Sequence, residues 1–332
     1  MNVRRLIVLC LFFVISCAEN QTSDSITIGT NPAGTFYYVV GTGLSKLFTE
    51  KLGIKSTAQP ASGSAVYVPL INNGEMSLGF STSIESGSYY NGEMNLQKQS
   101  NLRVLMRFWE MPYGYMVRGD SGLNFISDLV GKDIVDKQSA NLTLSIANKL
   151  MLESAGLSGN DYNAITVGGL PQGITAVTDG LADAAPIALG QGNVRKANAT
   201  TPGGIKFLDM SDIDGIEDFF DNKKKGFNAY TVTEDDQLPG AKPGLVTGSV
   251  DIYLIASSGM SAEDAERIIQ VIEENWQLLR TQFAALKRGS PDSFVDKNHT
   301  IPFHQGAINY YKKDGRWNPE LDQRNQLLLS NK

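Results

Sequence analysis

Two passages of this chain resemble each other, and their likeness constrains the fold more than any other feature. The passage "VPLINNGEMSLGFS" at residues 68–81 aligns with "ITAVTDGLADAAPI" at residues 174–187, which sets Ser77 opposite Asp183. In both passages an apolar helix pattern ends at a glycine and an apolar strand pattern follows. Two copies of one plan predict two lobes that are built alike, not an array of repeats.

Strand and helix patterns alternate along the rest of the chain. The predicted strands are residues 26–28, 55–59, 76–81, 102–108, 113–118, 134–135 and 250–256. Predicted helices end before Gly53, Gly74 and Gly156, and the clearest helix covers residues 261–279 behind a capping-box-like start. This alternation predicts an α/β fold with largely parallel sheets, in which pockets open where strands end and helices begin.

The first residues have the pattern of an export signal. Arg4 and Arg5 precede an unbroken apolar run at residues 6–15, which is too short to span a bilayer. Residues 1–16 are therefore predicted to be a signal peptide. The run ends in "VISC", which resembles a bacterial lipobox, so Cys17 is predicted to be lipidated as the mature N-terminus. Cleavage after Ala18 is the alternative.

The signal predicts where the protein is located: it is expected to be exported, periplasmic and membrane-anchored as a lipoprotein. Residues 17–25 are small and polar, which is typical of a tether. The second cysteine, Cys10, lies inside the signal, so no internal disulfide is expected. The formal net charge of −6 argues against nucleic acid as a partner, because phosphate binding needs a basic face.

The residues do not fit the common cofactor and catalytic motifs. The loop "GTNPAGTFYY" that begins at Gly29 has no lysine after its second glycine, and no G-x-G-x-x-G follows the strand, so a nucleotide cofactor is not expected. His299 and His304 lack the spacing of zinc ligands, and the sequence shows no G-x-S-x-G elbow and no paired carboxylates on matching loops. We therefore expect a binding protein without a metal, and not an enzyme.

Hydroxyl and amide side chains gather at the predicted helix starts instead. Backbone N–H groups at such positions bind carboxylates without any lysine or arginine. The residues of this kind are Thr35, Ser62, Ser64, Ser139, Asn141 and Thr143. For Ser62, Ser139 and Asn141, a role as helix N-caps is the purely structural alternative. Of Tyr37 and Tyr38, at least one is expected to line the cleft, because adjacent rings on one helix cannot both face inward.

Several motifs together resemble the TAXI proteins, the solute receptors of one class of tripartite (TRAP) transporters. They are "IGTNPAGTFYYVVG", "QPASGSAVYVPLINNGEMSLGFST", "DLVGKDI" and "IPFHQGAINYYKKDGRW", and the resemblance runs from Ile26 to Trp317. It implies a type II periplasmic-binding-protein fold with a hinge and an interlobe ligand cleft. Residues 26–112 plus 252–332 would form lobe 1, and residues 113–251 lobe 2.

The resemblance also implies a function. Members capture a small organic acid, an amino acid or a dicarboxylate such as glutamate or 2-oxoglutarate, and deliver it to membrane permease subunits of a TRAP transporter. The alternative with the same fold is a lipid-anchored solute sensor that signals to a membrane partner. His304 matches the closing motif and is expected to pin the C-terminal helix to lobe 1, not to bind a ligand.

By the same resemblance, loops of both lobes would supply the ligand-binding residues. These are Thr30, Gly34, Thr35, Tyr37, Ser62, Gly63, Ser64, Ser81 and Thr82 from lobe 1, and Ser139, Asn141 and Thr143 from lobe 2. The chain departs from the family at Thr35, Phe36 and the glycine-poor loop at residues 138–143. Arg107 and Trp109 precede the predicted crossover near Pro112, where an arginine at the cleft mouth would favour a dicarboxylate; a surface ion pair is the alternative.

Overall fold

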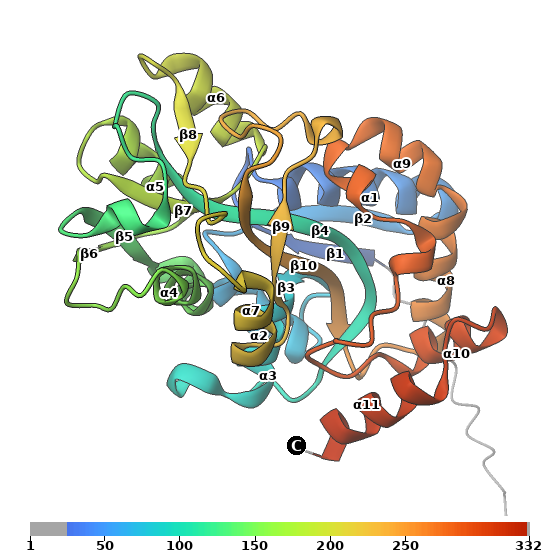
Figure 1. Ribbon diagram of the computed structural model, residues 1–332. Helices are drawn as coiled ribbons and strands as arrows, with labels where there is room; N and C mark the ends of the chain where they lie inside the picture. The colour runs from blue at the N-terminus through green and yellow to red at the C-terminus, as the bar shows by residue number, and fades with distance from the viewer. Residues whose placement is uncertain (1–24, 331–332) are drawn as a thin grey trace, which may run out of the picture.

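A mixed sheet forms the centre of the molecule. The computed structural model describes residues 25–330 (Figure 1). The predicted signal peptide, Cys17 and most of the tether lie outside the described residues. Of the helices within residues 25–330, none combines the length and apolar character needed to cross a membrane.

Ten strands of the described chain belong to this sheet. They are β1 (Ser25–Thr30), β2 (Lys55–Pro60), β3 (Leu78–Thr82), β4 (Leu102–Arg118), β5 (Asp133–Gln138), β6 (Asn163–Val167), β7 (Ala184–Ala188), β8 (Ile205–Phe207), β9 (Phe227–Thr231) and β10 (Val246–Ser257). The strand order is β2-β1-β3-β10-β4-β7-β5-β6, with β8 beside β4 and β9 beside β10. Strands β1, β2 and β3 are parallel, as are β5, β6 and β7, so each end of the sheet is an α/β unit.

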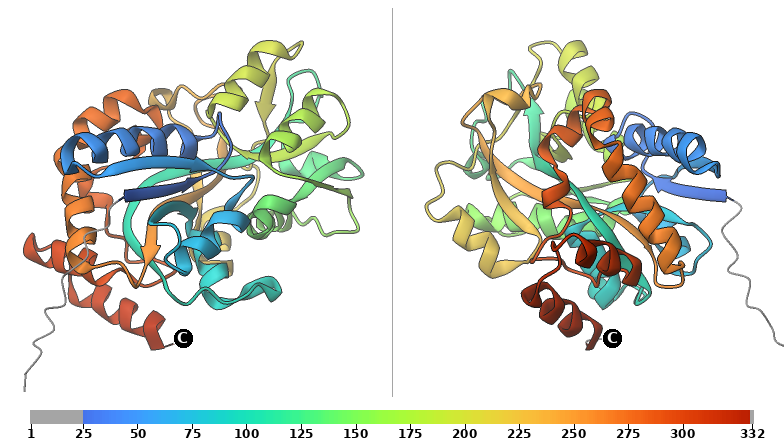
Figure 2. Two further views of the ribbon diagram at one scale, coloured as in Figure 1. Left: turned by 180° about the vertical axis from the view of Figure 1, so that it is seen from behind. Right: turned by 90° about the vertical axis from the view of Figure 1, so that its right-hand side faces the viewer.

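Helices cover both units. They are α1 (Phe36–Leu52), α2 (Ser64–Asn72), α3 (Ser83–Asn91), α4 (Ser145–Ser154), α5 (Leu170–Thr178), α6 (Gly192–Thr200), α7 (Ile216–Lys223), α8 (Ala262–Glu274), α9 (Trp276–Gln282), α10 (Gln305–Lys313) and α11 (Pro319–Ser330). Seen from behind, the blue helix α1 and the green helices of the second unit lie on opposite sides of the molecule (Figure 2). We call the part built on β1, β2 and β3 the first lobe, and the part built on β5, β6 and β7 the second lobe.

Two long antiparallel strands, β4 and β10, connect the lobes (Figure 1). Strand β10 pairs with β3 at one end and with β9 at the other, while β4 pairs with β7 from Tyr113 onward. The two strands predicted at residues 102–108 and 113–118 are therefore one strand, which corrects the expected break. Pro112 lies within it, just before pairing with β7 begins, where a missing N–H is tolerated more easily. The lobe boundaries near residues 112 and 251 stay a prediction.

The predicted likeness between the two passages is confirmed in the structure. Helices α2 and α5 occupy equivalent places, and each is followed by an equivalent strand, β3 or β7. The aligned residues also make the same contact: Thr27 N–H donates to Ser77 Oγ at 3.2 Å, and Asp133 N–H donates to Asp183 Oδ2 at 2.9 Å. Each lobe thus repeats one β-α-β-α-β plan.

His304 has the structural role that the sequence predicted. Its Nδ1 accepts from Gly306 N–H at 3.1 Å and caps α10, and its Nε2 lies 3.1 Å from the Met260 carbonyl. A neutral imidazole with its proton on Nε2 satisfies both contacts. This histidine therefore fixes the start of α10 against the segment before α8.

His299 makes the stability of the protein depend on pH. The side chain is fully buried, its Nδ1 lies 2.7 Å from the Asp296 carbonyl, and its Nε2 has no partner. Burial lowers the pKa of His299 to about 4. An unfolded histidine titrates near pH 6.5, so only the unfolded chain takes up this proton between those values, and stability falls as pH drops through that window.

We expect wild-type protein to lose about 2 kcal/mol of unfolding free energy through this group between pH 7 and pH 5. His299→Gln removes the titrating group, so the variant should lose correspondingly less over the same interval. Urea unfolding of both proteins at the two pH values measures the difference. Equal losses in the two proteins would show that His299 is not the group responsible.

Candidate functional site

The loops that follow the parallel strands of the two lobes face each other. Asn31 follows β1, Thr82 ends β3, and Gln191 follows β7. In open α/β sheets, ligands bind outside the carboxyl ends of the strands, where helix N-termini point. A ligand site is therefore expected where these loops of the two lobes meet.

A small cavity of about 20 Å³ lies there. Its lining comes from both lobes and from β4: Asn31, Thr35, Phe36, Tyr37, Thr82, Glu85, Met111, Tyr113, Leu144, Leu170, Ala188 and Gln191. A volume of this size holds about one water molecule. Any larger guest needs the lobes to stand farther apart than they do in this structure.

The buried carboxylate of Glu85 lines the cavity. Its side chain is 1% exposed. Ser64 Oγ donates to Oε1 at 2.6 Å and Thr143 Oγ1 donates to Oε1 at 3.3 Å, while Thr82 N–H donates to Oε2 at 3.3 Å. Ser64 and Thr82 belong to the first lobe and Thr143 to the second, so one carboxylate connects the two lobes.

Burial raises the pKa of Glu85, although the hydrogen bonds from Ser64, Thr82 and Thr143 oppose that shift. The described residues place no lysine, arginine or histidine in the lining of the cavity. The carboxylate is therefore held by three donors but has no charged partner, an arrangement that is unfavourable for an ionised group in a dry site.

Two amide side chains at the cavity also lack partners. Asn31 Oδ1 and Gln191 Nε2 are buried and make no hydrogen bond. Asn31 is 6% exposed and Gln191 is 3% exposed. Buried amide groups are nearly always satisfied in folded proteins, so an acceptor and a donor left free at one cavity indicate a place for a polar guest.

Close contacts around the cavity hold the lobes together. Asn193 N–H donates to the Gly34 carbonyl at 3.2 Å. Gly34 has φ +87°, and a Cβ there would lie 2.0 Å from Asn193 Oδ1. A Cβ on Gly63 would lie 2.2 Å from the Ala140 carbonyl oxygen. Glycine at these two positions lets the lobes approach closely.

The structure brings most of the predicted binding residues to this place. Thr35, Tyr37 and Thr82 line the cavity. Ser64 and Thr143 bind Glu85, and Asn141 Nδ2 donates to Ser64 Oγ at 3.4 Å. Thr35 and Thr82 also cap α1 and α3. The 3₁₀ segment Ser139–Leu144 precedes α4, where a helix start was expected. The cap alternative for Ser62, Ser139 and Asn141 does not hold, because the N-caps of α2, of the 3₁₀ segment and of α4 are Gly63, Gln138 and Leu144.

Four of the predicted hydroxyl residues neither line the cavity nor bind Glu85. Thr30 is buried and its hydroxyl donates to the Gln59 carbonyl at 3.4 Å. Ser81 is buried inside β3, where its hydroxyl is 3.4 Å from the Thr82 carbonyl. Ser62 and Ser139 are exposed. Their part in binding stays a prediction.

Arg107 and Trp109 do not reach the cavity either. Arg107 pairs with Asp251 on β10, with Nη2 and Oδ1 2.5 Å apart. An ion pair therefore forms as the alternative proposed, but it is largely buried and not at the surface. Trp109 is fully buried and packs edge-on against Tyr37 and Phe108. The register of β4 against β10 is irregular between Arg107 and Trp109, which turns Arg107 to the face opposite the one that carries Met111 and Tyr113.

Glu85, Asn31 and Gln191 are residues that the sequence reasoning missed. A signal for Glu85 was present, because Thr82-x-x-Glu85 directly after an apolar strand is a capping-box pattern. The structure confirms both bonds of that box. Asn31 lies within the loop that begins at Gly29, but the prediction there considered the hydroxyl residues and not the Asn31 amide.

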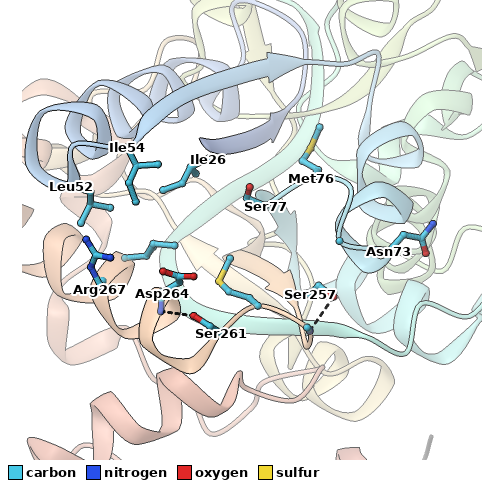
Figure 3. Close-up of a pocket in the computed structure, with 14 residues that line it drawn as sticks. Ile26, Leu52, Ile54, Asn73, Met76, Ser77, Ser257, Ser261, Asp264 and Arg267 are labelled. Carbon is cyan, nitrogen blue, oxygen red and sulfur yellow. Dashed lines mark hydrogen bonds between the residues drawn. The ribbon is translucent and has the colours of Figure 1, made fainter. Parts of the chain in front are cut away.

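A larger hollow of about 540 Å³ lies at the opposite end of the first lobe's strands (Figure 3). Figure 3 shows Ile26, Ile54 and Ser77 near the strand starts, facing Asp264 and Arg267 of α8. None of the predicted binding residues lines it. Since pockets of such sheets open at the carboxyl ends of strands, we assign the site to the smaller interlobe cavity.

A protein-family model described as NMT1-like matches residues 28–315, which is most of the chain. This chain belongs to the NMT1-like family. The matched span includes both lobes and every residue that lines the interlobe cavity of this NMT1-like protein. Among curated proteins, no relative matches the chain.

Solved structures show the fold of this NMT1-like protein. PhnD1 from Prochlorococcus marinus in complex with methylphosphonate matches 89% of this chain and 99% of its own, with 12% identity and a TM-score of 0.55. An ancestral arginine-binding protein bound to arginine matches 79% of this chain and 97% of its own, with 14% identity and a TM-score of 0.50. The fold is the two-lobe fold of periplasmic binding proteins, as the sequence predicted.

Within residues 25–330, no group of three or more His, Cys, Asp or Glu residues is arranged to hold a metal ion. The cavity of this NMT1-like protein thus offers hydrogen-bonding side chains, aromatic rings and one carboxylate. Such a set can hold and orient a small polar molecule.

Proposed function

We propose that this protein is an extracytoplasmic solute-binding protein that captures a small organic acid, either an amino acid or a dicarboxylate such as glutamate or 2-oxoglutarate. The observation that carries the proposal is the interlobe cavity with its unpartnered Asn31 and Gln191 amides. The NMT1-like family and the two-lobe fold support it. On this proposal the protein binds its solute without covalent chemistry.

Helix N-termini at the cavity support an acid as the solute. Thr35 and Gln191 line the cavity and stand at the N-caps of α1 and α6. Helix α6 has no side-chain cap; its Asn193 N–H donates to the Gly34 carbonyl, and the other N–H groups of its first turn have no side-chain partner. Together with the free Gln191 Nε2, these donors suit a carboxylate group.

Solute capture on this proposal requires the lobes to move. The cavity of about 20 Å³ is too small to admit an amino acid in the arrangement seen here. We propose that the solute enters with the lobes apart, binds one lobe first, and is then enclosed by the second lobe, as in hinge closure of other two-lobe proteins.

The partner and location belong to the same proposal. The motifs that resemble TAXI proteins support delivery of the solute to the permease subunits of a TRAP transporter. The signal-like residues 1–16 and the lipobox-like "VISC" support export to the periplasm and a lipid anchor at Cys17. No cofactor enters this proposal.

Native mass spectrometry of the protein without its signal, followed by thermal shift against amino acids and dicarboxylates, tests the function. We expect one class of acid to raise the melting temperature by about 5 °C at a hundredfold excess over its dissociation constant. The solute should be recovered unchanged after incubation. Conversion of the solute, or no shift with any acid of the panel, would contradict the proposal.

A further inference from the structure

We infer that Glu85 receives a positively charged ammonium group of the solute, so that the protein selects amino acids over dicarboxylates. This inference rests on the proposed function and names the solute class within it. Glu85 would be the residue that determines specificity.

The hydrogen bonds of Glu85 favour an ionised carboxylate. Ser64, Thr143 and the Thr82 backbone all donate to it, and the Thr82 side chain is a further partner. Each of these bonds favours the charged form of the carboxylate. Because Glu85 also lines the cavity, a cation that enters the cleft comes close to this charge.

The charge of Glu85 has no counterion among the described residues that line the cavity. Burying an unpaired carboxylate is strongly unfavourable, whereas a paired one is tolerated. A solute ammonium would supply the missing positive charge. A dicarboxylate would instead bring a second negative charge close to the first, which selects against it.

Aromatic rings of the same cavity add to the preference for a cation. Phe36, Tyr37 and Tyr113 line it together with Glu85. The faces of such rings attract a cation, most strongly where water is excluded. The combination of one carboxylate with several rings therefore suits an ammonium group better than an anion.

The groups around Glu85 should neither release nor take up protons when a solute binds. The titratable side chains that interact with Glu85 are Tyr37, Tyr67, Tyr89 and Tyr113, from α1, α2, α3 and β4. Burial raises the pKa of all four, so they stay neutral between pH 6 and pH 9. Proton exchange at the site on binding would then come from Glu85 or the solute.

Isothermal titration calorimetry with matched solutes tests the inference. The pairs are L-glutamate with glutarate and L-leucine with 4-methylpentanoate, in which only the amino group differs. For a pair that binds, we expect the amino acid to bind about a hundredfold more tightly than its partner. In Glu85→Gln the preference should fall below about tenfold, while Glu50→Gln, an exposed change on α1, should keep it.

Proton exchange gives a readout that a merely structural role would not produce. Titrations in two buffers of different ionisation enthalpy measure protons released or taken up on binding. An ammonium that binds ionised Glu85 should release protons or leave their number unchanged, since it stabilises the carboxylate. A dicarboxylate that binds protonated Glu85 should take protons up as the pH rises.

The outcomes separate the inference from the proposed function. Tight binding of glutarate with proton uptake, or an amino-acid preference that survives in Glu85→Gln, would overturn the role of Glu85 but keep an organic-acid receptor. Failure of every acid to bind wild-type protein would overturn both. Circular dichroism and melting of Glu85→Gln confirm that lost preference is not lost folding.

Discussion

Gly63→Ala is expected to weaken solute binding about a hundredfold while leaving each lobe folded. A Cβ at this position would lie 2.2 Å from the Ala140 carbonyl oxygen and 2.7 Å from Asn141 Oδ1, both in the second lobe. The backbone of Gly63 is extended, so alanine adopts it without strain. The methyl group should therefore keep the two lobes apart, and on the proposed function both lobes must contact the solute. Losing about 3 kcal/mol of second-lobe contacts corresponds to a hundredfold.

The internal repeat supplies a matched control at Gly169. This glycine precedes α5 as Gly63 precedes α2, and its backbone is extended too. A Cβ on Gly169 would meet its nearest atom, Gln172 Oε1, at 3.4 Å, an ordinary contact. Gly169→Ala should bind as wild type does. Calorimetry measures affinity, and small-angle scattering with saturating solute measures closure; equal affinities of the two variants would show that closure does not depend on this contact.

Arg107→Ala should destabilise the protein by about 3 kcal/mol at pH 7, because it leaves the Asp251 carboxylate without its partner. Asp251 is 4% exposed and receives two contacts from Arg107, at 2.6 Å from Nε and 2.5 Å from Nη2. Burial raises the pKa of Asp251 to about 6 even with Arg107 beside it. Without the arginine that pKa should rise further.

The pH dependence of this loss distinguishes a buried charge from lost packing. A raised folded-state pKa means that ionisation of Asp251 opposes folding as pH rises through about 6. At pH 5 the carboxyl group is mostly protonated in both proteins, so the difference between Arg107→Ala and wild type should shrink. Urea unfolding at pH 5 and pH 7 measures it. Arg118→Ala, which removes the partner of the exposed Asp120, is a control that should change little. A loss that is the same at both pH values would contradict the charge argument.

The sequence predicted the architecture well because the fold depends on patterns that are local. Periodic apolar residues and glycine stops marked most helices and strands, and the passages at residues 68–81 and 174–187 predicted the repeated plan that α2, β3, α5 and β7 display. The predicted break near Pro112 was wrong, because proline removes one N–H but does not end a strand whose neighbours change at that point.

The site was predicted in part. Hydroxyl residues at helix starts were found, because capping and anion binding use the same residue types. Glu85 was not predicted, because an acidic residue in a helix is ordinarily a cap or an exposed charge. Only tertiary packing shows that the Glu85 side chain is buried. The aligned passages held a further hint: continued to the next loop, the same register sets Gln191 opposite Glu85.

The side-chain direction along β4 could not be predicted either. Arg107 was expected near the cleft because it precedes the crossover, yet the structure pairs it with Asp251 on the neighbouring strand. Met111 and Tyr113 line the cavity from the same strand instead. Strict alternation would put these three residues on one face, but the irregular register of β4 against β10 between Ile252 and Tyr253 turns Arg107 to the other face. A local sequence pattern does not show such an irregularity.

The uninterrupted course of β4 and β10 through both lobes has a mechanical consequence. A flexible linker would let the lobes wander through many orientations, whereas two hydrogen-bonded ribbons can only flex and twist about their own line. On the proposed closure, the motion of the lobes would approach a single elastic coordinate, and little orientational entropy would be lost. A membrane partner that contacts both lobes would then detect, from the distance between them, whether the cleft is occupied.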